Sequence, residues 1–234
     1  MTPVKLGALA EMAINVSTKD STALADSDVA EMADLCALVQ NGYEIGVLSK
    51  QAEEWVLATL SREEGVLTGF AFSTLERIGG TPAVLLGLVV VDRREDGADI
   101  LAALMRDQMR RAVLAFPDED VLVGSRLASA VGFDAFADLI DHIPRPDHKA
   151  SGEERAWGRR LAKRFRIETS AYEDRTFRAK GDGSVSCVLD YQRADSREPA
   201  PEIAAFFADL DVAAGDALIG FGWAMAEYLD GMNT

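Results

Sequence analysis

The longest uninterrupted aliphatic run in the chain, Ala83 to Val91, limits the folds that are open to it. A helix that crosses a membrane needs about 20 apolar residues, so this run is too short to span one. Short runs that are apolar at every position are typical of a strand whose two faces are both covered by other side chains. The run therefore predicts a central strand inside a sheet.

The segments around this run predict the rest of the sheet and the helices that cover it. Strand-like residues occur at 55–60 and 66–75, and short polar or glycine-containing turns separate them from each other and from the central run. Strands joined in this way form an antiparallel meander. The spacing of apolar residues then predicts helices at 98–116 and 128–140 around a short strand at 121–123. The expected fold class is α/β (α+β), with a mostly antiparallel central sheet flanked by helices.

The remaining segments predict smaller elements on either side of this core. Before the core we expect a strand at 12–16 and a helix at 26–43. After it we expect a helix at 153–165, a hairpin that pairs 176–178 with 185–191, and two helices at 201–210 and 212–229. The chain would thus form one domain over 1–196, with an insertion at about 141–167, followed by a helical extension over 197–234 packed on the core. The apolar surplus of the last helix also fits a homodimer interface.

Composition narrows the partners and the compartment. The formal net charge of −15 disfavours general binding to nucleic acid or to anionic membranes. The N-terminus lacks the pattern of a signal peptide, so the expected location is the cytoplasm. Cys36 and Cys187 are far apart in sequence and read as reduced thiols, and His142 and His148 lie in a proline-rich loop. These residues do not have the spacing of a metal site, and none is predicted.

The turn after the central run, Arg93 to Asp99, is the strongest candidate for a binding site. Backbone N–H groups at a helix N-terminus bind anions, and a glycine there lets a ligand come close to the backbone. A structural interpretation is equally open, because acidic residues favour the first turn of a helix and Asp96 or Asp99 could cap it. The turn therefore predicts either an anion site or the start of a helix alone.

The order of helices and strands expected over residues 10 to 191 resembles that of the GNAT family of N-acetyltransferases. The turn from Arg93 to Asp99 resembles the family's motif at the same place. The family motif is Arg/Gln-x-x-Gly-x-Gly/Ala; Arg94 and Gly97 match it, and Asp99 stands where glycine or alanine is expected. The resemblance implies an acyl-CoA N-acyltransferase-like fold with acetyl-CoA as cofactor. The residues that it implies for cofactor binding are Leu88, Val89, Val90, Arg93, Arg94, Gly97 and Ala98.

The catalytic residues do not follow from the resemblance. Many family members carry a tyrosine in the helix after the next strand, and residues 129–136 contain none. Asp92 and Glu76 are conceivable general bases, so no catalytic residue is assigned. The first hypothesis is transfer of an acetyl group from acetyl-CoA to a small-molecule or peptide amine. The second is a non-catalytic binding or interaction protein on the same fold, which the acidic turn and the missing tyrosine favour.

One basic segment stands out in this acidic chain. Residues 151–166 contain six Lys or Arg and two Glu. Trp157, Leu161 and Phe165 recur every four residues and predict a helix that docks through this stripe. The basic face is either solvated or a site for an acidic partner or phosphate groups.

Overall fold

The computed structural model describes residues 14–40, 42–137, 140, 142–184, 186–195 and 197–225. Its helices are α1 (Asp26–Val39), α2 (Ile45–Glu54), α3 (Gly97–Ala115), α4 (Ala130–Ala137), α5 (Gly152–Arg164) and α6 (Pro201–Phe207). Its strands are β1 (Asn15–Asp20), β2 (Leu57–Glu63), β3 (Val66–Ile78), β4 (Thr81–Val91), β5 (Val121–Leu127), β6 (His142–Ile143), β7 (Tyr172–Glu173), β8 (Arg178–Ala179), β9 (Leu189–Asp190) and β10 (Ala217–Ala224).

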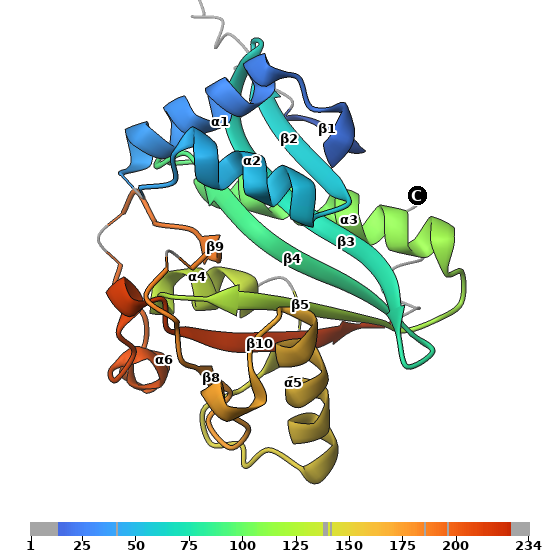
Figure 1. Ribbon diagram of the computed structural model, residues 1–234, viewed down its shortest axis with the longest axis vertical. Helices are drawn as coiled ribbons and strands as arrows, with labels where there is room; N and C mark the ends of the chain where they lie inside the picture. The colour runs from blue at the N-terminus through green and yellow to red at the C-terminus, as the bar shows by residue number, and fades with distance from the viewer. Residues whose placement is uncertain are drawn as a thin grey trace, which may run out of the picture.

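The described strands form one sheet in the order β1-β2-β3-β4-β9-β5-β10-β8-β7, and β6 pairs with β10. Neighbours from β1 to β4 are antiparallel, whereas β4 and β5 run parallel. In Figure 1, α1 and α2 lie in front of the sheet and α3 lies behind it. The predicted fold class, a mostly antiparallel sheet flanked by helices, is confirmed.

The central strand β4 is buried along its whole length after Thr81. Gly87 within it allows a close contact, because a Cβ at this position would overlap the indole ring of Trp55. The indole is fixed in turn, since Trp55 Nε1 donates a hydrogen bond to Gln51 Oε1 at 3.0 Å. The sequence-predicted burial of the run on both faces is therefore confirmed.

A buried polar cluster joins α3 to the first strands. Thr18 Oγ1 donates to Asp107 Oδ2 at 2.6 Å, and Arg111 Nε donates to the same oxygen at 2.8 Å. Burial alone would raise the pKa of Asp107, but these hydrogen bonds and the nearby guanidinium hold it below its usual value. Arg111 lies one helical turn after Asp107 in α3, and the hydrogen bond from Thr18 attaches the helix to β1.

The prediction of a second helix over 212–229, and with it a purely helical extension over 197–234, is wrong. Residues 217–224 form β10, which pairs antiparallel with β5 and also with β8 and β6. The run is buried at nearly every position, as a strand inside a sheet requires, so its apolar residues do not form one helical face. The sheet is therefore continuous across the boundary expected at 196, and α6 confirms only the first predicted helix. Residues 226–229 lie outside the described part.

The predicted hairpin of 176–178 with 185–191 is also wrong. β8 pairs with β7 and β10, whereas β9 pairs with β4 and β5 in parallel.

Within the expected insertion, α5 packs on β10, where the rings of Trp157 and Trp223 meet edge to face with centroids 5.6 Å apart. The predicted apolar stripe of α5 is confirmed as buried.

Candidate functional site

A gap opens between the two parallel strands at the centre of the sheet. β4 and β5 pair from Ala83 with Leu122 to Leu86 with Ser125, and no direct pairing continues toward their carboxyl ends. The backbone groups of β4 beyond Leu86 therefore need other partners, because buried N–H and C=O groups are rarely left unpaired. In mixed and parallel sheets, ligands commonly bind where neighbouring strands separate at their carboxyl ends.

A segment of the same chain occupies this gap. Val89 pairs with Leu189 and Val90 with Asp190, while Leu127 of β5 also faces Leu189. The Val89 N–H donates to the Val188 carbonyl at 3.1 Å. Figure 1 shows β9 beside the end of β4. The gap therefore accepts an extended chain with amide groups that hydrogen-bond to β4.

Two tyrosines outside the predicted site lie at this gap. The Tyr43 hydroxyl donates to the Ser186 carbonyl at 2.9 Å, just before β9. Burial raises the pKa of the Tyr43 phenol, which keeps it protonated and able to donate at neutral pH. The ring of Tyr191 lies over the start of α3, 3.5 Å from the position that a Cβ on Gly97 would take. Sequence reasoning missed both because each lies in a loop without a local motif.

The turn between β4 and α3 brings the predicted arginines to the same end of the sheet, but each has protein partners. Arg94 pairs with Glu63 at 2.6 Å and with Asp96 at 2.5 Å, and these hydrogen bonds raise its pKa. Arg93 donates to the Val39 carbonyl. Asp96 occupies the N-cap position of α3, yet its side chain makes no capping hydrogen bond. The turn is thus a helix start in which Arg94 is already paired with two carboxylates, while Arg93 binds a backbone carbonyl.

The seven residues implied for cofactor binding lie between β4 and the start of α3, and some are buried while others are exposed. Leu88, Val89 and Val90 are fully buried in β4, and Gly97 is buried at the first residue of α3. Arg93 and Ala98 are exposed, and Arg94 is partly exposed. They lie together at the carboxyl end of β4, and their role toward acetyl-CoA stays a prediction.

Of the two conceivable general bases, only Asp92 lies near the gap. Glu76 faces Ala83 at the opposite end of β4 and forms a bidentate pair with Arg164 at 2.6 Å. Asp92 follows β4 directly, and its N–H donates to the Thr68 carbonyl at 2.9 Å. The helix α4 lies after β5 as expected, and Phe133 and Phe136 fill the core from it.

A buried arginine lies close to the occupied gap. Arg126, near the end of β5, has a buried Nε without a hydrogen-bond partner, and its guanidinium is 5.3 Å from the Phe165 ring centroid. Burial lowers the pKa of Arg126 and raises that of the neighbouring Cys187 thiol. A protonated, buried thiol is a poor nucleophile. Both cysteines are buried, and the described residues contain no cluster that could hold a metal ion.

Among known proteins, only solved structures were found to be similar to this chain. No family model matches the chain, and no curated protein matches it. An aminoglycoside 6'-N-acetyltransferase from Enterococcus faecium is 15% identical with a TM-score of 0.38, over 48% of this chain and 61% of that one. An acyl-CoA N-acyltransferase from Pseudomonas aeruginosa is 14% identical with a TM-score of 0.40, over 54% of this chain and 86% of that one.

A GNAT family acetyltransferase from Brucella melitensis, solved in complex with acetyl-CoA, is 18% identical with a TM-score of 0.33, over 47% of this chain and 75% of that one. None of the described helices is long and apolar enough to span a membrane. By their names, these three solved structures are acetyltransferases or acyltransferases.

Proposed function

We propose that this protein is a GNAT-like N-acyltransferase that transfers an acetyl group from acetyl-CoA to an amine. The observation that carries the proposal is the hydrogen bond from the Val89 N–H to the Val188 carbonyl in the gap between β4 and β5. The pantetheine arm of acetyl-CoA is also an extended chain with amide groups. It would take the place of residues 186–190 along β4.

Three kinds of group at the gap would then promote the transfer: backbone N–H groups, a phenol and a carboxylate. Acetyl-CoA supplies the activated acetyl group. Backbone N–H groups along Leu88 to Val90 are held rigidly in β4, so they would stabilise negative charge on the thioester oxygen without reorganisation. Tyr43 is a protonated phenol at the mouth of the gap and would donate a proton to the leaving sulfur. Asp92, the carboxylate that directly follows β4, would accept a proton from the amine.

The turn before α3 would hold the pyrophosphate. The N-terminus of a helix of this length favours anions, and Arg94 would exchange Glu63 and Asp96 for phosphate oxygens. This exchange reduces the net gain from binding, because the arginine loses two carboxylate partners. Acetyl-CoA affinity is therefore expected to be modest while residues 186–190 remain in the gap.

The substitution Arg94→Glu is expected to weaken acetyl-CoA binding by about 100-fold, because it replaces an attractive charge beside the pyrophosphate by a repulsive one. Calorimetric titration of the purified protein with acetyl-CoA and with free CoA measures the change. Arg106→Glu is the matched control, since Arg106 lies exposed on α3 and has no ion-pair partner among the described residues. Equal losses in both variants would count against a site at the turn.

A second function is favoured by the same gap in its occupied state. If residues 186–190 stay permanently between β4 and β5, the protein is a non-catalytic binding or interaction protein on this fold. The hydrogen bond from Tyr43 to Ser186 stabilises that state, and the ion pairs of Arg94 occupy the cation that would otherwise bind a phosphate. The titration separates the two functions, because this second one predicts no acetyl-CoA binding up to about millimolar concentration.

A further inference from the structure

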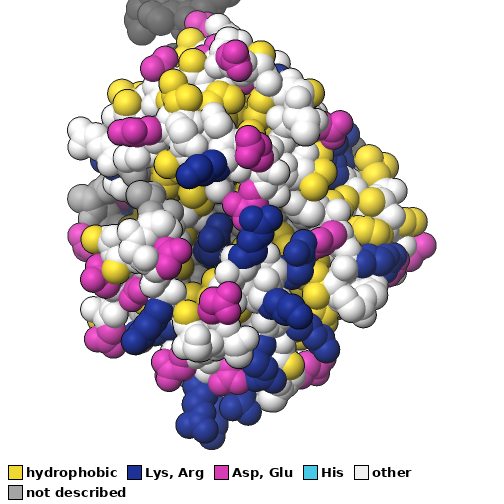
Figure 2. Space-filling model, in the orientation of Figure 1, with side chains coloured by type: hydrophobic (Ala, Val, Ile, Leu, Met, Phe, Trp, Pro, Cys, Tyr) yellow, Lys and Arg dark blue, Asp and Glu magenta, His cyan; other side chains and the backbone are white. Residues whose placement is uncertain are grey.

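A cavity of about 580 Å³ lies on the other side of β10 from the gap, between the loop before α5 and the turn from β7 to β8. Its basic lining comes from Arg145, His148, Lys149, Arg155, Arg175 and Arg178. Figure 2 shows Lys and Arg side chains gathered over the lower half of the molecule, where Figure 1 places α5. This concentration contrasts with the net charge of −15 for the whole chain.

Three of these cations lack a carboxylate partner. Arg178 pairs with Asp209 at 3.0 Å, and His148 lies 2.9 Å from Glu154. In the part of the chain that the structure describes, no carboxylate lies within ion-pair distance of Lys149, Arg155 or Arg175. The cavity therefore carries positive charge that the protein itself does not neutralise.

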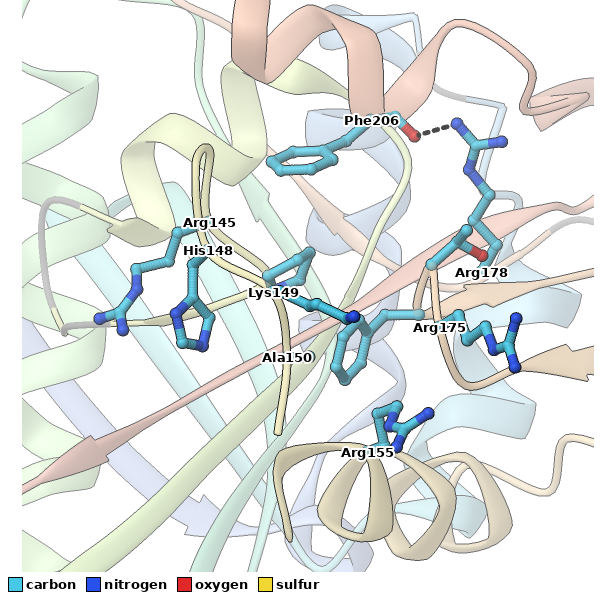
Figure 3. A pocket seen from close by; sticks show the side chains of 11 residues that line it. Arg145, His148, Lys149, Ala150, Arg155, Arg175, Arg178 and Phe206 are labelled. Carbon is cyan, nitrogen blue, oxygen red and sulfur yellow. Dashed lines mark hydrogen bonds between the residues drawn. The ribbon is translucent and has the colours of Figure 1, made fainter. Parts of the chain in front are cut away.

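Two elements, β10 and the start of α5, fix the walls of the cavity, and part of its lining is apolar. Phe177 and Pro144 are buried in its wall, and the Ile219 N–H of β10 donates to the Phe177 carbonyl at 2.8 Å. On the other side, Ser151 and Glu154 form a capping box that fixes the start of α5. Figure 3 shows Lys149, Arg155 and Arg175 reaching the cavity from the loop, the helix and the turn.

We propose that this cavity binds a small organic polyanion, a ligand with two or more phosphate groups on a compact body. Its volume lies within the range of about 300–1,000 Å³ that small-molecule sites occupy. Unpaired cations on three sides match separate anionic groups, and the floor of Phe177 and Pro144 suits an apolar or planar body. Nucleic acid fits less well, because a long polyanion would also meet the acidic remainder of the surface.

The site is separate from the one proposed for acetyl-CoA. None of its lining residues belongs to β4, β5, β9 or the turn before α3. Of the basic segment that the sequence indicated, only Arg155 lines the cavity; Arg159 pairs with Asp174, Arg164 with Glu76, and Arg166 with Glu54. The proposed site is thus built mainly by residues outside that segment.

The test is calorimetric titration with ATP and with inorganic pyrophosphate, both without metal ions. The double variant Lys149→Ala/Arg175→Ala is expected to bind ATP at least about tenfold more weakly than the unmodified protein. Binding should also weaken severalfold between about 50 mM and about 300 mM salt. Both residues are exposed, so an unchanged thermal unfolding midpoint is expected for the double variant.

Two control proteins make the result specific. Arg106→Ala/Lys163→Ala removes the same charge from exposed positions outside the cavity and should change ATP affinity less than about twofold. Arg94→Glu should leave this site unchanged, which separates it from the acetyl-CoA site. An equal loss in both double variants would overturn the proposal. So would the absence of saturation by either probe up to about 10 mM, or an oligonucleotide that binds more tightly than ATP at about 150 mM salt.

Discussion

Replacement of Leu189 by asparagine is expected to tighten the apparent binding of acetyl-CoA by at least about tenfold. Leu189 is 1% exposed and lies between β4 and β5. An amide in that apolar position loses its hydrogen bonds to water, so the state in which residues 186–190 fill the gap is weakened. Apparent affinity rises with the fraction of molecules whose gap is open. Calorimetric titration of both proteins measures the change.

Val212→Asn is the control for this experiment, because it makes the same kind of change at a residue that is 47% exposed. It should leave acetyl-CoA affinity within about twofold of that of the unmodified protein. A thermal unfolding curve for each variant shows that the sheet remains folded. Affinity that does not rise in folded Leu189→Asn protein would mean that β9 and acetyl-CoA do not compete for the gap.

Truncation of Phe221 to alanine is expected to lower the free energy of unfolding by about 3–5 kcal/mol. Phe221 is 1% exposed in β10, and its ring lies 5.9 Å from that of Phe177. The strand pairs with β5 on one side and with β8 and β6 on the other. The hole left by the missing ring would therefore lie against a strand held from both sides, and it could not collapse easily. Urea unfolding followed by tryptophan fluorescence measures the loss.

Val212→Ala, in the short helical turn before β10, should cost less than about 0.5 kcal/mol in the same assay. A helix that only covers the core would tolerate truncation better than a central strand. If Phe221→Ala costs as little as Val212→Ala, the placement of β10 inside the sheet is wrong.

The parts of the fold that the sequence predicted are those whose local pattern agrees with their tertiary setting. The run from Ala83 to Val91 is apolar throughout, and β4 is buried on both faces. The helical spacing after Gly97 matches α3, which buries one side against β3 and β4. Local propensity and long-range packing point to the same structure in these segments.

The parts that failed are decided by partners far away in sequence. Residues 217–224 become a strand because β5 offers an unpaired edge, and no local pattern reveals that edge. β9 has two residues and exists only because β4 and β5 separate beyond Leu86. The occupation of the predicted cofactor gap could not be predicted for the same reason. The charge balance of the turn could be predicted, because Glu95, Asp96 and Asp99 are visible in the sequence. Asp96 does pair with Arg94.

Hydrogen exchange, followed by mass spectrometry with and without saturating acetyl-CoA, tests whether acetyl-CoA and residues 186–190 compete for the gap along β4. Competition means that both occupy the same gap. It predicts faster exchange in residues 186–190 when acetyl-CoA is present, because their pairing with β4 is lost. Residues 88–90 should stay protected, since the ligand replaces the carbonyl of Val188. Unchanged exchange in residues 186–190 at about millimolar acetyl-CoA would contradict the claim.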